Sequence, residues 1–187
     1  MRATEAFIAD PEQSADDFAW FRNSWSELQA RKDGLTLDAQ GLGPLVRAAG
    51  KLLSVSRRQS NQAWLSSTRD TQLPTAAAFG MLVVHDARSN AQRIQPGRMW
   101  QRLHLWATSQ GLAMQPLNQV VERADREQSA GLDPRFTRAI AAMLPERGWQ
   151  AVMPFRLGYP SVETLPSPRA ASRGGRAELV ARGWPHL

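Results

Sequence analysis

The stretch WQAVMPFRLG, from Trp149 to Gly158, limits how this chain can fold. It is apolar enough to form a strand with both faces covered, but Pro154 lies within it. Because proline has no N–H to donate to a neighbouring strand, the sequence predicts that this strand lies at the edge of a sheet or is broken at Pro154. A second apolar run, AAAFGMLVVHD at 76–86, predicts a buried strand over Phe79–Val84.

Four other segments carry apolar residues at helical spacing and are expected to form helices. The first follows Ser14, where a capping box is expected, and runs for about four turns. The other three begin near Pro44, at Pro96-Gly97 and at Asp133-Pro134. The polar, aperiodic segment 57–75 is interpreted as a loop or a frayed helix end.

These elements predict a mixed α/β (α+β) fold with two strands. Two strands alone make an unstable sheet, so we expect a small sheet covered by helices or completed by strands from elsewhere. The chain of 187 residues is long enough for a substantial core. We expect one domain over 1–187, with 170–187 as a flexible tail.

The composition excludes several classes of protein. Cysteine is absent, and the three histidines lie far apart without metal-ligand spacing, so neither a disulfide nor a metal site is expected. The sequence contains neither an apolar stretch long enough to span a membrane nor a signal peptide, which predicts a cytoplasmic protein without membrane partners. The net charge of +6 favours anionic partners. However, the arginines are scattered between acidic residues, so nucleic acid is not the expected partner.

Two segments carry residues that could hold a ligand. In the first, GLAMQPLNQ at 111–119, a glycine ends the third expected helix and Pro116 keeps the next residues extended. Backbone polar groups then stand beside the amides of Asn118 and Gln119, a surface that can bind the polar edge of a flat heterocycle. The alternative is a plain helix-to-strand connection in which Pro116 only stops the helix.

The second segment is GYPSVETLPSPR at 158–169. Prolines, and the residues that precede them, favour extended geometry. The sequence therefore predicts a stiff arm that carries Ser167 and Arg169 to a distant point. A guanidinium and a hydroxyl group match the oxygens of a phosphate. The alternative is a solvated basic terminus, as most charge runs are.

Three motifs resemble the C-terminal half of the nitroreductase family of FMN-binding oxidoreductases, in its dormancy-associated branch. They are WQRLHLWATSQGLAMQPLNQ at 100–119, FRLGYPSVETLPSPR at 155–169 and RKDGLTLDAQGL at 31–42. The resemblance covers nearly the whole chain. It implies a partial nitroreductase-like fold, FMN as the cofactor, and a homodimer, because family members build the cofactor pocket from two subunits.

The resemblance also implies which residues contact the cofactor. The residues expected at the edge of the isoalloxazine ring are Pro116, Leu117, Asn118 and Gln119, and those expected at the phosphate are Ser167 and Arg169. Family members also open with a basic, serine-containing segment that grips the same phosphate, and this chain begins after that point. SRRQSN at 56–61 has suitable residue types but is not expected to replace that segment, since short basic motifs match by chance.

The expected function is hydride transfer from a nicotinamide donor, NADH or NADPH, through FMN to a quinone or nitroaromatic acceptor. No acid, base or nucleophile of the protein is needed for this chemistry, so no catalytic residue is predicted. A second hypothesis is a truncated, non-catalytic nitroreductase-like protein that binds flavin weakly or not at all. A third, nucleic-acid binding, rests on the positive charge alone.

Overall fold

A computed structural model describes residues 1–22, 24–31, 34–35, 48 and 55–160 of the chain. Residues 1–16 and 57–161 belong to one compact unit, and residues 17–56 to a second. The fold is α+β, with helices around a small antiparallel sheet. The predicted fold class is therefore confirmed, whereas the second helix expected from Pro44 lies outside the described residues, apart from the helical residue 48.

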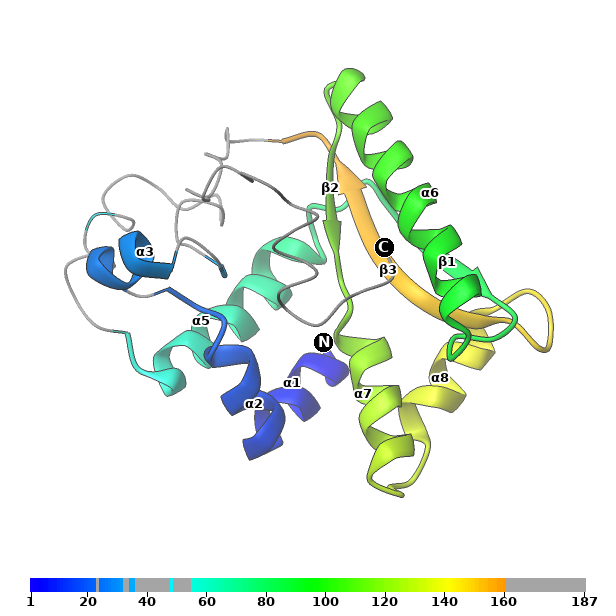
Figure 1. Cartoon of the computed structure of the whole chain (residues 1–187), viewed down its shortest axis with the longest axis horizontal. Coiled ribbons are helices and arrows are strands. Elements are labelled where there is room, and N and C mark those ends of the chain that lie inside the picture. Colours follow the sequence, from blue (N-terminus) through cyan, green and yellow to red (C-terminus); the bar gives the residue numbers. More distant parts are fainter. Residues whose placement is uncertain (23, 32–33, 36–47, 49–54, 161–187) are drawn as a thin grey trace. The chain divides into compact units, whose positions relative to one another are not determined.

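The sheet contains three strands rather than the two expected. They are β1 (Ala78–Val84), β2 (Ala113–Pro116) and β3 (Gln150–Gly158), in the order β1-β3-β2 (Figure 1). Both pairings are antiparallel. The prediction of a strand over Phe79–Val84 is confirmed, and the additional strand β2 lies in the segment interpreted as a possible ligand loop.

Pro154 lies in the central strand, so the prediction that its strand is at an edge or broken there is wrong. The reason is the direction in which Pro154 faces. Its carbonyl oxygen accepts a hydrogen bond of 2.8 Å from the Leu117 N–H, just beyond the last residue of β2. In an antiparallel pair, the N and C=O of one residue point toward the same neighbouring strand. The nitrogen of Pro154 therefore points toward the end of β2, so its missing N–H removes no hydrogen bond to β1.

Helix α6 (Asn90–Ser109) covers one face of the sheet (Figure 1). The Trp100 ring lies 5.5 Å, between centroids, from the ring of the buried Phe155 on β3. The Phe155 ring in turn occupies the space where Gly80 on β1 lacks a Cβ atom. Aromatic packing between α6 and the sheet therefore forms much of the core on this face.

The start of α6 differs from the expected start at Pro96-Gly97. Ser89 caps the helix by accepting a hydrogen bond from the Gln92 N–H, and Pro96 lies inside it. Pro96 is the seventh residue of α6, past the first turn where proline is tolerated without loss, so the helix forgoes one backbone hydrogen bond there. The helix ends as predicted, because Gly111 adopts a left-handed conformation with φ of 70°.

The remaining helices correct three further expectations. Segment 57–75, interpreted as a loop or a frayed helix end, is mostly helical. The segment that begins at Gln119 forms a helix that the sequence analysis missed. The first expected helix is divided into separate pieces. These helices are α1 (Arg2–Ala9), α2 (Pro11–Phe18), α3 (Trp25–Arg31), α5 (Arg57–Ser67), the π-helical η2 (Thr68–Gln72), α7 (Gln119–Ser129) and α8 (Arg135–Met143).

The first expected helix is interrupted after Phe18 because the backbone pairs with a later segment instead. The Arg22 N–H donates to the Leu35 carbonyl over 2.9 Å, and the Leu35 N–H donates to the Trp20 carbonyl over 2.9 Å. Gly34 makes the required turn with φ of 76°. Backbone groups engaged in this bridge cannot take part in a helix.

Helices α1, α7 and α8 are joined by buried charged groups. Arg123 on α7 donates to the Asp10 carboxylate over 2.9 Å and to the Gln13 amide oxygen over 2.6 Å. Glu127, which is 4% exposed, accepts the backbone N–H bonds of Phe136 at the start of α8. Helix α7 therefore binds the turn between α1 and α2 at one point and caps α8 at another.

Candidate functional site

The predicted ring-binding segment is a tight junction between β2 and α7. β2 pairs with β3 from Ala113 opposite Gly158 to Pro116 opposite Phe155. The Leu117 N–H then bonds to β3, which holds the chain on the sheet for one residue more. The segment therefore contains the helix-to-strand connection from α6 to β2, but Pro116 ends β2 rather than stopping the helix, and the binding of a heterocycle here stays a prediction.

Asn118 begins α7 in an uncommon way. Its backbone carbonyl accepts hydrogen bonds of 2.9 Å from the Val121 and Glu122 N–H groups, so it occupies the N-cap position. The side chain of an N-cap asparagine usually accepts a bond from the first turn of its helix, but the Asn118 side chain makes no such bond. Its Oδ1 atom is buried and has no hydrogen-bond donor.

A buried acceptor without a donor is rare in a native protein, and costs about 1–3 kcal/mol. Residues at binding sites are a common exception, because the ligand supplies the missing partner. The Asn118 carbonyl oxygen is therefore a polar atom of this junction for which the described residues supply no donor. Beside it, Pro116 is exposed, and Leu117 and Gln119 are partly buried.

The phosphate-binding half of the predicted site cannot be placed. Ser167 and Arg169 lie outside the described residues. The four predicted ring contacts are consecutive residues from the end of β2 to the start of α7, and both they and the two phosphate contacts remain predictions from the sequence.

Arg156 on β3 is a polar residue of this region that the sequence analysis did not assign to the site. Its Nε donates to the Gln115 side-chain oxygen over 2.7 Å, and its Nη1 donates to the Gln72 carbonyl over 2.9 Å and to the Thr75 hydroxyl over 3.0 Å. These acceptors are neutral, and burial lowers the pKa of Arg156. Arginine in an otherwise apolar strand was the sequence signal that could have revealed it.

The arrangement places a partly buried positive charge beside the strand that leads into the junction. Gln115 immediately precedes Pro116, and no carboxylate among the described residues pairs with Arg156. A fixed cation without a counter-ion favours negative charge on a group bound nearby.

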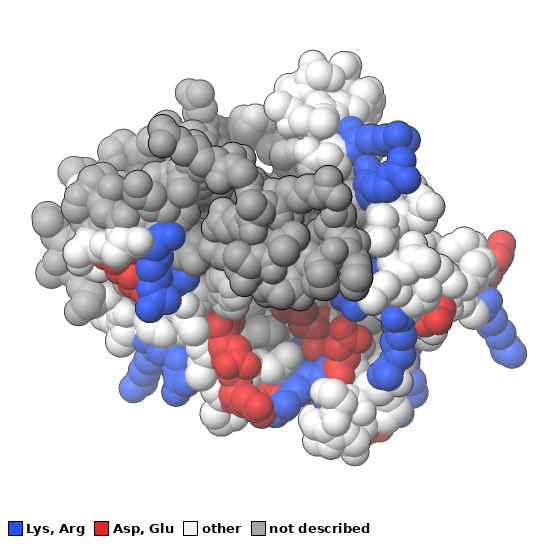
Figure 2. Space-filling model, in the orientation of Figure 1, with Lys and Arg blue, Asp and Glu red and all other residues white. Residues whose placement is uncertain are grey.

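The described residues lack the clustered ligands of a metal site and, on the face drawn in Figure 2, the continuous basic surface of a nucleic-acid site. The described residues contain no group of three or more His, Asp or Glu side chains that could hold a metal ion. On the face in Figure 2, the Lys and Arg side chains of the described residues are spread among Asp and Glu side chains and form no continuous basic surface there. Within the described part of the chain, no helix has the length and apolar character needed to cross a membrane.

Comparisons with protein-family models, with curated proteins and with solved structures find no match for this chain.

Proposed function

We propose that this protein is an FMN-dependent NAD(P)H oxidoreductase of the nitroreductase type, which transfers a hydride to a quinone or nitroaromatic acceptor. The observation that carries the proposal is the buried Asn118 oxygen without a donor, at the junction where the sequence motifs predict contact with the flavin ring. The motifs supply the identity of the ligand, and the Asn118 oxygen supplies a chemical reason for a ligand at this place.

The residues fit one edge of an isoalloxazine ring. That edge presents an N–H group between two carbonyl groups, so it needs one acceptor flanked by donors. Asn118 Oδ1 would accept from the N–H, and the Gln119 amide and backbone N–H groups of the same turn are the candidate donors. Pro116 and Leu117 would contact the ring, while Ser167 and Arg169 would bind the phosphate as the motifs imply.

When bound, FMN supplies the hydride chemistry itself. The contribution of the chain would be to orient the ring, and to stabilise the negative charge that the ring gains on reduction. Arg156 suits the second role, because its charge is balanced by no carboxylate among the described residues. We further propose a cytoplasmic homodimer in which nicotinamide donor and acceptor use the same site in turn.

The test is flavin content, followed by reconstitution. The full chain, purified under mild conditions, is expected to be yellow, or to quench FMN fluorescence in a saturable titration. Asn118→Leu keeps the approximate volume but removes the acceptor, and is expected to weaken FMN binding about tenfold. Because it also removes a buried group without a partner, it is not expected to lower the stability of the flavin-free protein.

The matched control is Asn90→Leu, an exposed asparagine in the first turn of α6, which should bind FMN as the unchanged protein does. A colourless protein that FMN cannot reconstitute would overturn the proposal and favour the non-catalytic alternative. Equal FMN affinity for the Asn118→Leu and Asn90→Leu variants would show that the ring does not use this junction.

A further inference from the structure

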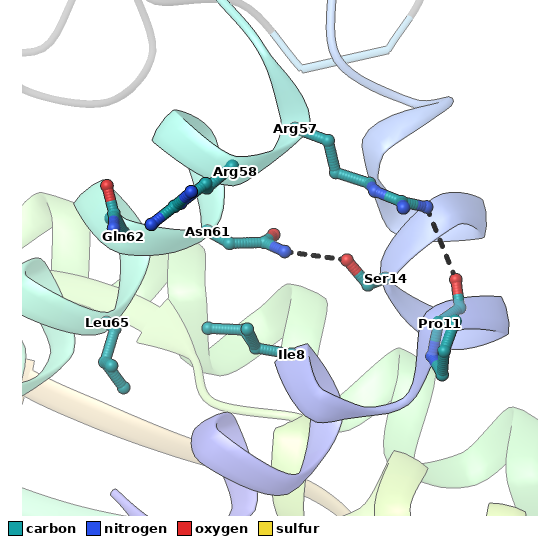
Figure 3. Close-up of a pocket in the computed structure, with 8 residues that line it drawn as sticks. All are labelled: Ile8, Pro11, Ser14, Arg57, Arg58, Asn61, Gln62 and Leu65. Carbon is teal, nitrogen blue, oxygen red and sulfur yellow. Dashed lines mark hydrogen bonds between the residues drawn. The ribbon is translucent and has the colours of Figure 1, made fainter.

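A hollow of about 410 Å³ lies where α5 faces α1 and α2 (Figure 3). The hollow is more open than enclosed, so a small molecule bound there would stay partly exposed to solvent. Its lining includes two arginines, neutral polar groups and aliphatic side chains: Arg57, Arg58, Ser14, Asn61, Ile8 and Leu65. None of these residues belongs to the proposed flavin site.

The hollow exists because α5 is joined to α2 by polar contacts rather than by an apolar seam. No residue of α5 is fully buried. The Asn61 amide donates to the Ser14 hydroxyl over 2.7 Å, and Arg57 reaches the Pro11 carbonyl over 3.5 Å. These bonds span the hollow and leave space between the two helices (Figure 3).

The hollow carries positive charge that nothing in its lining balances. Its lining contains no acidic side chain, and the first turn of α5 has none either. Within the described residues, neither Arg57 nor Arg58 forms an ion pair, whereas Arg123 and Arg126 on α7 both pair with Asp10. Both arginines line the hollow; consecutive residues of a helix diverge in direction, so Arg57 extends toward Pro11 and Arg58 extends toward Gln62 (Figure 3).

Ser14 adds a buried hydroxyl group to the lining. It is only 3% exposed, yet it lines the hollow. Its oxygen accepts the bond from Asn61, and its hydroxyl group can donate a further bond. A hydroxyl can accept and donate at the same time, so an oxygen atom of a ligand placed here would receive a hydrogen bond from Ser14.

We propose that this hollow binds a small organic anion, in which an oxyanion is joined to a compact apolar group. Arg57, Arg58 and Ser14 would donate to the oxyanion, since charge-assisted bonds from guanidinium groups suit carboxylate and phosphate oxygens. Ile8 and Leu65 would cover the apolar group. The site is separate from the proposed oxidoreductase function, and the test of the site does not depend on that function.

The experiment is a titration of the ¹⁵N-labelled full chain, followed by NMR, with three probes of similar size. Phenyl phosphate and benzoate carry the two forms of oxyanion, and benzyl alcohol is neutral. Saturable shifts are expected for amides at the start of α5 and around Ser14. At least one anion should bind about tenfold or more tightly than the alcohol, and the tighter anion identifies whether the natural ligand is a phosphate or a carboxylate.

Two variants then locate the binding. Arg57→Gln combined with Arg58→Gln should weaken anion binding about tenfold or more, while the control pair Arg88→Gln and Arg93→Gln, also exposed, should leave it unchanged. Leu65→Trp should fill the apolar part of the hollow and reduce the affinity of both anions. The proposal is overturned if no probe binds, if the alcohol binds as well as the anions, or if the two double variants bind equally.

Discussion

Replacing Asp10 with alanine should destabilise the protein by about 3–5 kcal/mol, because Asp10 is the counter-ion of a buried arginine. The Arg123 side chain is 10% exposed and that of Asp10 is 13% exposed, and their ion pair spans 2.9 Å. Arg123 Nε already lacks a hydrogen-bond partner. Removal of the carboxylate would leave the guanidinium buried with the neutral Gln13 oxygen as its remaining acceptor.

Asp10 also caps α2, since its Oδ1 accepts the Glu12 and Gln13 N–H groups, each over 3.2 Å. Loss of such a cap costs about 1 kcal/mol and is included in the expected total. Asp10→Asn should cost less, because the amide oxygen can still cap the helix. Asp16→Ala changes an exposed carboxylate on the same helix and should alter stability by no more than about 0.5 kcal/mol.

Urea unfolding followed by tryptophan fluorescence at neutral pH measures these differences.

The stabilisation that Asp10 provides should also depend on pH. Burial would raise the pKa of Asp10, but hydrogen bonds from Gln13, Arg123 and Arg126 outweigh it and hold the pKa below its ordinary value of 3.8. The Asp10 contribution is therefore complete above about pH 4 and is lost as the pH falls through the lowered pKa. Asp10→Ala and Asp16→Ala variants of equal stability at pH 7 would refute this reasoning.

Two further substitutions test other parts of the fold. Gly80→Ala should destabilise the protein by about 1–3 kcal/mol, because the added Cβ would come within 2.9 Å of three atoms of the Phe155 ring; an unchanged urea midpoint would argue against this packing. Glu127→Ala should cost about 1–3 kcal/mol by leaving the buried N–H group of Phe136, and the N–H group of Thr137, without acceptors. Faster hydrogen exchange confined to the start of α8 is the expected sign, and unchanged exchange there would contradict it.

The sequence predicted the elements whose apolar residues follow a regular pattern. The run at Phe79–Val84 is continuous and has clear ends, so β1 was recognised. Helix α8 was recognised because Phe136 and Ile140, both buried, lie one turn apart behind Pro134. The buried residues of these elements are apolar side chains in a regular pattern, which can be recognised from the sequence.

The errors arose where structure depends on partners that the sequence does not reveal. Helix α5 has no fully buried residue, so it lacks the apolar stripe that identifies a helix. Helix α7 is held largely through Arg123 and Glu127, whose burial follows from Asp10 and from α8. Pro154 was misjudged because a sequence does not show toward which neighbour a missing N–H points.

The sequence also predicted only part of the candidate site. The motifs pointed to residues 116–119, which are consecutive and run from the end of β2 to the start of α7, and their contact with a cofactor stays a prediction. The unpartnered oxygen of Asn118 could not be foreseen, since a buried group is known to lack a donor only when its surroundings are known. The sequence likewise could not show that the acceptors around the Arg156 guanidinium group are neutral.

The order of the strands has a consequence for how the protein is made. β3 lies between β1 and β2 but comes after both in the chain. As the ribosome releases the chain from its N-terminus, two outer strands emerge with no partner to join them. The sheet can close only when Gly158 has left the ribosome, so the nascent chain exposes apolar strand surface from the emergence of β1 until that of β3 and is a natural client for chaperones during that interval.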